Sequence, residues 1–424
     1  YWTYYQNNRY DLLERTRVEN FTLEDIKTWD ASKIIEQSIQ YYKNSISEPE
    51  RLQQVSLEGY NDMLNNYVYD KYIPNGRKYR PTLYDFLAFK AIGFFSNKEA
   101  GVTRPAEQFL LNDPIFMSDA KEFSGLDITT KDVFSFDYYA ITILRDVIRF
   151  HLNDGNIDAL VDADLKRLEF VYNSSGNAEK ENLYLKALQN LLDKYSVYPV
   201  STLISYEIAN VYQGRGAKYV PGISDNFKDD LKIAYSICKD AADKYPDSDG
   251  AQNCRAIMAA LDSKSLQITL EAYNIPDKPF RTLVTYKNVN KLYYKVVETS
   301  YDEIKKIEED YSNYNDYAKY NAEIINKFSG RDAVHSFNIS LPNDGDLQTH
   351  KAEVKIPALK AGVYVMLAGT SESFSYTENA VAYCLLNINS LSYINKTNEK
   401  KDIEFYTLNR DNGYPLEGAD AVIY

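Results

Sequence analysis

The chain has 424 residues, 44% of them hydrophobic, and a formal net charge of −13 from 48 Lys plus Arg against 61 Asp plus Glu. Such a length suits two or three domains, because a single hydrophobic core stops growing at about 250 to 300 residues. The acidic balance without a dense basic run argues against nucleic acid as a partner. No apolar run approaches the roughly 20 residues that cross a bilayer, so no membrane-spanning segment is expected.

The first 262 residues have helical periodicity. One apolar stripe, from Tyr138 to Leu152, precedes Gly155, a residue that commonly ends helices. Residues 112–130 are rich in Asp, Ser and Pro, which predicts a long irregular connection. Residues 1–262 are therefore predicted to form an all-α domain of tetratricopeptide-like helix pairs. Its last four helices are expected at Leu183–Tyr195, Ser201–Tyr212, Asp229–Tyr245 and Gly250–Ala260.

After residue 262 the apolar period changes to two. The clearest alternation is Ala352, Val354 and Ile356, and similar runs separated by Gly and Pro bring the expected number of strands to about seven. This pattern predicts an antiparallel β-sandwich over residues 263–392. Residues 393–424 show the same alternation and break off at Ala421–Tyr424, which predicts the first strands of a further sandwich in a longer protein.

One helix, residues 301–328, is expected inside the sandwich. Ser300 and Glu303 have capping-box spacing, and Ser329-Gly330 is a stop signal. Its apolar stripe has seven-residue spacing with Asn321 as a polar member. A coiled coil is one interpretation. Packing of the stripe on the sheet or on the helical domain is the favoured one.

Few residues suggest catalysis or metal binding. His151, His335 and His350 lack partners at metal-ligand spacing, so each is interpreted as structural. Gly214-Arg215-Gly216 lacks the Lys and Ser/Thr of a phosphate loop. Asp229 with Asp230, and Glu308–Asp310, are expected on solvated helix faces. No catalytic, cofactor-binding or metal-binding residue is therefore assigned, no cofactor is expected, and the chain is not expected to be an enzyme.

Two acidic loops have simpler interpretations than calcium binding. Asp247-Ser248-Asp249-Gly250 resembles part of a calcium loop, but Tyr245 and Ala256 stand where further oxygen ligands would be needed. A turn followed by a helix N-cap is favoured there. Asn343-Asp344-Gly345-Asp346 is interpreted as a hairpin turn.

The three cysteines, Cys238, Cys254 and Cys384, exclude a disulfide-rich scaffold. Cys384 is expected to be a packed core thiol. Cys238 and Cys254 lie on two predicted helices on either side of the turn at 246–249, and either a disulfide or two buried free thiols is possible, because the distance between the two backbones decides.

The β-rich segment resembles the N-terminal part of bacterial alpha-2-macroglobulin-like proteins. The resemblance rests on the strand runs from Leu266 onward and on a succession in which a strand, an Asn-Arg-x-x-Gly turn, Pro-Leu and Gly-Ala follow one another. That succession consists of Asn409, Arg410, Gly413, Pro415, Leu416, Gly418 and Ala419. Helical domains before the first sandwich are similar to those of larger members from Bacteroidetes-type bacteria.

The resemblance implies a protease trap of the cell envelope, facing the periplasm and often lipid-anchored, whose bait segment is cut before its domains close around the protease. The implied partners are proteases and, through the helical domain, another envelope protein. No cysteine here has the C-x-E-Q thioester pattern, since Cys238 is followed by Lys-Asp, Cys254 by Arg-Ala and Cys384 by Leu-Leu. The chain is thus expected to be a non-catalytic scaffold segment of an inhibitor.

Two other classes of function remain open. The 39 Tyr residues would suit a helical outer-membrane lipoprotein that stacks aromatic rings on glycans. Proteins of that kind remain helical to the end, however, which disagrees with the predicted sandwich. A surface adhesin built from sandwiches is the third class.

Overall fold

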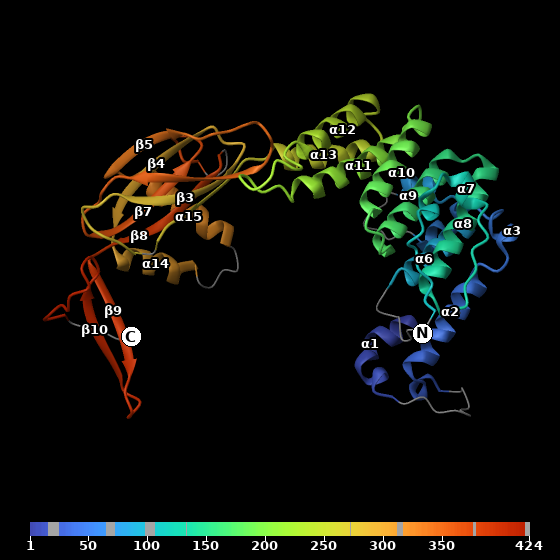
Figure 1. Ribbon diagram of the computed structural model, residues 1–424, viewed down its shortest axis with the longest axis horizontal. Coiled ribbons are helices and arrows are strands. Elements are labelled where there is room, and N and C mark those ends of the chain that lie inside the picture. The colour runs from blue at the N-terminus through green and yellow to red at the C-terminus, as the bar shows by residue number, and fades with distance from the viewer. Residues whose placement is uncertain are drawn as a thin grey trace. The chain divides into compact units, whose positions relative to one another are not determined.

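The computed structural model describes residues 1–15, 25–64, 73–97, 107–132, 134–271, 273–311, 317–375 and 379–419. A helical region is followed by antiparallel and mixed β-sheets (Figure 1), which confirms the predicted fold class. The chain folds into two compact units. Unit 1 is Tyr1–Gly214 with Ile233–Met258, and unit 2 is Arg215–Lys232 with Ala259–Tyr424. Within the described ranges, no helix is both long and apolar enough to cross a membrane.

The helices before the sheets alternate with short connections. Their bounds are α1 Trp2–Leu13, α2 Ala31–Ser45, α3 Pro49–Leu52, α4 Asn61–Leu64, α5 Ile73–Tyr79, α6 Leu83–Phe95, α7 Ala120–Ser124, α8 Phe136–Asp154, α9 Ile157–Ser174, α10 Lys180–Tyr195, α11 Ser201–Gly216, α12 Asp230–Lys244 and α13 Asp249–Asp262. The last four match the helices expected from residue 183 on to within a few residues at each end.

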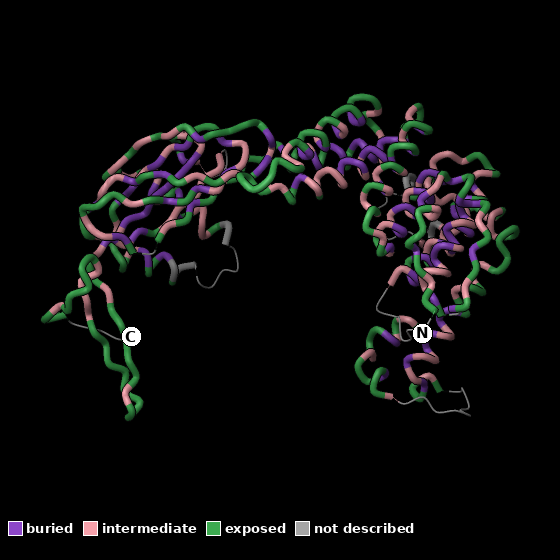
Figure 2. The backbone as a smooth tube through the Cα atoms, viewed as in Figure 1, coloured by how far each residue is buried: buried purple, intermediate pink, exposed green. Residues whose placement is uncertain are grey.

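The core of unit 1 is organised around α8, whose apolar stripe is visible in the sequence. Ile141, Leu144, Val147 and Ile148 are fully buried in one apolar cluster with residues of α6 and α9. The helix ends at Gly155, which has a φ of 70° and therefore adopts the left-handed conformation that favours glycine. Figure 2 shows the resulting alternation of buried and exposed positions along these helices.

The segment at 112–130, expected to be irregular throughout, contains two short ordered elements. Pro114–Met117 forms a 3₁₀ turn and Ala120–Ser124 forms α7. Asp113 and Asp119 cap these elements by accepting from the backbone N–H groups of Ile115 and Lys121. Both elements are too short to produce a helical period in the sequence, but the Asp residues in front of them are the expected cap residues.

Unit 2 contains two larger sheets and a hairpin. A three-stranded sheet has the order β1-β3-β6, a five-stranded sheet has the order β2-β8-β7-β4-β5, and β9 pairs with β10. All pairs are antiparallel except β2 with β8. The bounds are β1 Ser265–Thr269, β2 Tyr273–Asn274, β3 Phe280–Lys287, β4 Lys291–Thr299, β5 His335–Ser340, β6 Thr349–Ile356, β7 Gly362–Gly369, β8 Val381–Ile388, β9 Leu391–Thr397 and β10 Ile403–Asn409.

The two larger sheets enclose one apolar core. Val284 and Val354 of the three-stranded sheet belong to the same buried cluster as Tyr294, Met366 and Leu386 of the five-stranded sheet. Alternate residues of β3, β4 and β6 supply this core, as the period of two predicts. β7 differs because most of its residues are buried on both of its faces.

Helices cover the outer face of the five-stranded sheet, which explains the burial of β7. The predicted helix 301–328 is two helices in the described residues, α14 Tyr301–Tyr311 and α15 Tyr317–Ser329. Ile307 and Phe328 pack in a second buried cluster with Val365 and Leu367 of β7. Asn321 accepts a hydrogen bond from the hydroxyl of Tyr383 on β8 at 3.1 Å. The favoured interpretation, in which the apolar stripe packs on the sheet, is therefore confirmed.

The hairpin β9–β10 is more exposed than the two larger sheets (Figure 2). Its strands pair from Leu391↔Asn409 to Thr397↔Ile403, so alternate residues face opposite sides. Apolar side chains stand on both faces: Tyr393 and Phe405 on one, and Ile394 and Tyr406 on the other, each more than 40% exposed. The predicted strand end at Ala421–Tyr424 lies outside the described residues.

Candidate functional site

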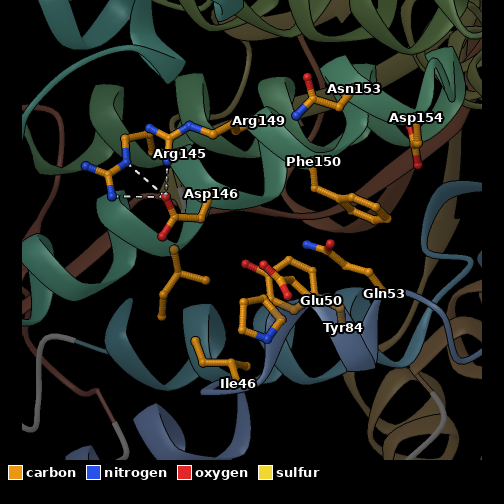
Figure 3. A pocket seen from close by; sticks show the side chains of 12 residues that line it. Ile46, Glu50, Gln53, Tyr84, Arg145, Asp146, Arg149, Phe150, Asn153 and Asp154 are labelled. Atoms are coloured by element: carbon orange, nitrogen blue, oxygen red, sulfur yellow. Dashed lines mark hydrogen bonds and ion pairs between the residues drawn. The ribbon is translucent and has the colours of Figure 1, made fainter.

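A cavity of about 750 Å³ opens beside α8 in unit 1 (Figure 3). Two walls come from segments far apart in sequence: one is the end of α2 with α3, and the other is the C-terminal part of α8, from Ile143 to Asp154. Tyr84 of α6 contributes to the floor, and burial raises its pKa. The lining residues are Ile46, Pro49, Glu50, Gln53, Tyr84, Ile143, Arg145, Asp146, Arg149, Phe150, Asn153 and Asp154.

The two arginines of the cavity are already engaged by the protein. Arg145 and Arg149 both contact Oδ1 of Asp146, at 2.9 and 3.3 Å, as the dashed lines in Figure 3 mark. Arg145 also donates to the carbonyl of Leu126 at 3.1 Å, and Arg149 donates to the carbonyl of Ser124. These bonds satisfy carbonyls at the end of α7. The guanidinium groups therefore hold α7 against α8, which leaves the cavity poorly suited to capture an anion.

Next to this cavity lies a buried charge network centred on His151. Its Nε2 is 2.9 Å from Oδ1 of Asp85, and its Nδ1 is 2.9 Å from Oδ2 of Asp154. The imidazole is 1% exposed and Asp85 is fully buried. Oδ2 of Asp85 accepts from the backbone N–H and the hydroxyl of Thr82, in the capping box that begins α6. Asp85 therefore has two roles: it completes the capping box of α6, and it contacts His151 of α8.

The network holds a proton on the histidine. An imidazolium can donate from both ring nitrogens to these two carboxylates, whereas a neutral imidazole can donate to only one of them. Burial alone lowers the pKa of His151, but the hydrogen bond and charge of Asp85, with the charge of Asp154, raise it above the ordinary value. Both nitrogens are already bonded, so this histidine is suited to stabilising a charge rather than to transferring protons.

A second buried ion pair was not found by sequence reasoning. Arg167 contacts Asp164 at 2.6 Å within α9, and both side chains are at most 2% exposed. Arg167 also donates to the carbonyl of Phe116 at 2.9 Å and lies over the ring of Phe123 at 4.5 Å. The i, i+3 spacing of the pair is that of an ordinary exposed helix pair. Its contacts with Phe116 and Phe123 place the segment at 114–124 over this part of α9.

The other two histidines are held by local contacts in unit 2. Nε2 of His350 is 2.9 Å from Oδ1 of Asp346, a carboxylate only 1% exposed. Nε2 of His335 lies 3.3 Å from the carbonyl of Ala358. Among the described residues, no three His, Cys, Asp or Glu side chains are arranged to hold a metal ion.

The two acidic loops behave as turns, with one difference. Ser248 accepts from the N–H of Ala251 and so caps α13, as expected for this type of loop. Asn343 accepts from the N–H of Gly345, which has a φ of 63°. This turn joins β5 to β6, which belong to different sheets, so the predicted hairpin is wrong. Turn chemistry specifies the bend but not the sheet that receives the next strand.

Of the paired acids Asp229 and Asp230, one is exposed as expected and the other is not. Asp229 is exposed beside Lys232, as expected. Asp230 is not solvated: its side chain is 9% exposed and pairs with Arg215 at 2.8 Å. Arg215 stands in the Gly214-Arg215-Gly216 run, which forms the end of α11 and no phosphate loop. Of the acidic run at 308–310, Glu309 is exposed, and the side chains of 308 and 310 lie outside the described part of the chain.

The cysteines are thiols on three different elements. Cys238 of α12 and Cys254 of α13 are fully buried, and Cys384 of β8 is half-buried. Burial raises the pKa of Cys384 to about 12, so its thiol is protonated and inert at neutral pH. This agrees with the prediction of a packed core thiol.

Comparisons with known proteins give only distant structural similarity. No family model matches the sequence, and no curated protein matches it significantly. Native alpha-2-macroglobulin from Escherichia coli is similar over 37% of this chain, with 14% identity, in two solved structures. For the structure spanning domains MG0-NIE-MG1, the match covers 48% of that chain with a TM-score of 0.24. For the structure spanning NIE-MG1, it covers 74% with a TM-score of 0.27.

A third solved structure is the CARDB domain of a Pyrococcus furiosus protein in complex with two metal ions. It matches 30% of this chain and 92% of its own length, with 12% identity and a TM-score of 0.17. The chain therefore has a distant structural resemblance to bacterial alpha-2-macroglobulin domains. At these TM-scores the resemblance assigns no function.

Proposed function

We propose that this chain is a non-catalytic scaffold segment of a bacterial alpha-2-macroglobulin-like protease inhibitor of the cell envelope. In this proposal, the sandwich of unit 2 is a macroglobulin-like domain, and β9–β10 belongs to a further domain of the same kind. The helical unit positions the trap or contacts another envelope protein. Proteases are partners of the whole inhibitor rather than of a site in this segment.

The observation that carries the proposal is the geometry of the chain from β10 onward. After Asn409 the chain reverses, and Gly413 donates to the carbonyl of Asn409 at 2.7 Å with a φ of 76°. Pro415 then bridges back to Leu408, and the N–H of Leu416 donates to the carbonyl of Thr407 at 3.0 Å. The Asn-Arg-x-x-Gly, Pro-Leu succession thus brings a third segment alongside β10.

The exposed hairpin also supports a further domain. A two-stranded hairpin alone is marginally stable in water, and a sandwich buries one face of each sheet. Here Tyr393 and Phe405 approach with ring centroids 5.8 Å apart on an otherwise exposed face. Such a pair is the expected start of a sandwich core.

The engaged charges of unit 1 support the non-catalytic part of the proposal. His151 is bonded at both ring nitrogens, and the arginines of the cavity bind backbone carbonyls. Groups committed to internal bonds hold helices together and are not available to bind or activate a substrate. In the proposed scaffold these residues stabilise the packing of the helices.

The proposal is tested by mixing the protein that carries this segment with an endopeptidase and following both partners by gel filtration. We expect cleavage outside residues 1–424, followed by migration of the protease with the cleaved protein. The 424-residue chain alone is the control and should leave the protease free. A protease that degrades the protein without remaining associated would refute the proposal.

One observation favours glycan binding as a second candidate. A cavity of about 370 Å³ in unit 1 is lined by Tyr1, Trp2, Tyr41 and Tyr42 together with Lys90. Aromatic faces beside hydroxyl and amine groups suit the apolar and polar sides of a sugar ring. Calorimetric titration with oligosaccharides decides it: saturable binding that is lost in Tyr41→Ala supports glycan recognition, and absence of heat removes this candidate.

A further inference from the structure

Two buried thiols face each other in the helical hairpin α12–α13. Cys238 and Cys254 are both fully buried and lie apart from the cavities and charge networks described above. The pKa of Cys238 is raised and that of Cys254 is lowered, each chiefly by the other thiol, so the two side chains are neighbours. Both lie in unit 1. Two buried thiols in one helical hairpin are a candidate pair for oxidation to a disulfide.

The register of the hairpin explains why the two sulfurs meet. The helices are joined by the short turn around Pro246, and Cys238 and Cys254 are equally far from that proline along the chain. Residues equidistant from the turn of an antiparallel helix pair lie at the same height along the two helices, and burial of both sulfurs places them on the packed side. Ala241 and Ala251 are also equidistant from Pro246 and are both buried. These small side chains lie between the turn and the cysteines along the chain.

A tight contact fixes the start of α13 as well. A Cβ placed on Gly250 would lie 2.2 Å from the carbonyl carbon of Thr202 in α11. The hydroxyl of Ser248, in the turn, is 2.8 Å from the hydroxyl of Thr202. The hairpin is therefore anchored at its turn, which limits sliding of α13 and keeps the two sulfurs opposed.

We propose that Cys238 and Cys254 form an intramolecular disulfide when the protein folds in an oxidising compartment. The oxidant is the active-site disulfide of a thiol–disulfide oxidoreductase. The proposal does not depend on the inhibitor function.

The exchange is balanced in two steps. The Cys254 thiolate attacks one sulfur of the oxidant's disulfide, which forms a mixed disulfide and releases the oxidant's other sulfur as a thiolate. The Cys238 thiolate then attacks Sγ of Cys254, forms the Cys238–Cys254 bond and releases the second oxidant sulfur. The pair loses two electrons and two protons, and the oxidant becomes a dithiol.

Burial sets the timing of this reaction. Neither sulfur is accessible once α12 and α13 have packed, so exchange takes place on the folding chain or in a locally open hairpin. After packing, the same burial protects the bond from reductants. The cross-link then stabilises the folded hairpin, because it reduces the conformational entropy of the unfolded chain.

Alkylation in denaturant tests the proposal and uses Cys384 as an internal control. Protein produced in an oxidising compartment is denatured without reductant, treated with a maleimide and weighed by mass spectrometry. We expect one added group, on Cys384, and three after reduction, with a linked peptide that joins Cys238 to Cys254. Three groups without reduction, or a link to Cys384, would overturn the proposal.

Thermal unfolding gives a second readout that does not depend on chemical labelling. Wild type that has been reduced in denaturant and refolded in reductant should melt at a lower temperature than the oxidised wild type, close to that of the Cys238→Ala, Cys254→Ala double variant. Cys384→Ala should keep the full reductant dependence. Equal melting temperatures of the oxidised wild type and the reduced, refolded wild type would contradict a stabilising cross-link.

Discussion

Nε2 of His151 on α8 lies 2.9 Å from Oδ1 of Asp85 on α6, and this buried bond joins the two helices through the capping box of α6. Because Asp154 contacts the other nitrogen, the interaction depends on a protonated ring. The stability of the α6–α8 contact should therefore respond to pH.

The direction of this response follows from the raised pKa of His151. A folded-state pKa above the unfolded value, about 6.5, gives stability that is fully present below the unfolded pKa and is lost as pH rises through the folded one. We expect the protection of α6 and α8 amides against hydrogen exchange, corrected for intrinsic rates, to decline from about pH 6.5 upward. His151→Gln should flatten this profile and His335→Gln should leave it unchanged. Constant protection in the wild type would contradict the imidazolium.

Replacing Arg167 with Met should destabilise unit 1 strongly. The change leaves Asp164, about 2% exposed, as an unpaired buried carboxylate, a situation that costs about 3 to 5 kcal/mol. The double variant with Asp164→Leu should recover much of the loss. Lys239→Met is the matched control, because its partner Asp243 is on an exposed helix face and such pairs contribute at most about 1 kcal/mol. Urea unfolding checks all three, and equal effects of the two single variants would disprove the distinction.

Gly250→Ala should destabilise the packing of α13. The new Cβ would lie 2.2 Å from the carbonyl carbon of Thr202 and 2.4 Å from the N of Leu203, so the backbone must move. Overpacking of this kind costs about 1 to 3 kcal/mol. Gly93→Ala, within α6 and with no atom within 4 Å of the added carbon, should instead stabilise by up to about 1 kcal/mol. Melting temperatures that change in the same direction would count against the close contact.

Acid should weaken the attachment of α14 to the segment after α15. Hydrogen bonds from Arg331, with those from Thr299 and Lys327, lower the pKa of Glu303 to about 2. A depressed pKa gives stability that is present above the unfolded value, about 4.3, and is lost as pH falls toward about 2. With allowance for solvent screening, the contribution is about 1 kcal/mol.

We expect Glu303→Gln to lower stability at neutral pH and to reduce the acid sensitivity of unit 2 between about pH 4.5 and about pH 2. Glu309→Gln, an exposed position on the same helix, should do neither. Hydrogen exchange of α14 peptides reports the effect locally. An acid profile of Glu303→Gln identical to that of the wild type would show that the ion pair is not formed in solution.

Periodicity predicted the elements that bury one face. The stripe of α8, the alternation of β6 and the last four helices before the sheets could all be identified because each has a regular spacing of three to four or of two. The same spacing indicated that the stripe of α14 and α15 needs an apolar partner, and Val365 and Leu367 of β7 supply it.

Features set by tertiary contact could not be predicted in this way. Asp230 and Asp164 have the sequence setting of surface acids, and only the packing of Arg215 and Arg167 against them shows their burial. His151 was interpreted as structural, but its carboxylate partner could not be predicted, because Asp85 lies on another helix. The turn at Asn343–Gly345 was recognised, whereas its role between two sheets depends on long-range strand pairing.

The most direct test of the proposed inhibitor compares two substrates of one protease. After reaction with the protein that carries this segment, the protease is assayed with a small peptide and with a large protein substrate. A trap encloses the protease without blocking its active site, so we expect peptide hydrolysis to persist while cleavage of the protein substrate is lost. Equal inhibition of both, or of neither, would contradict the account.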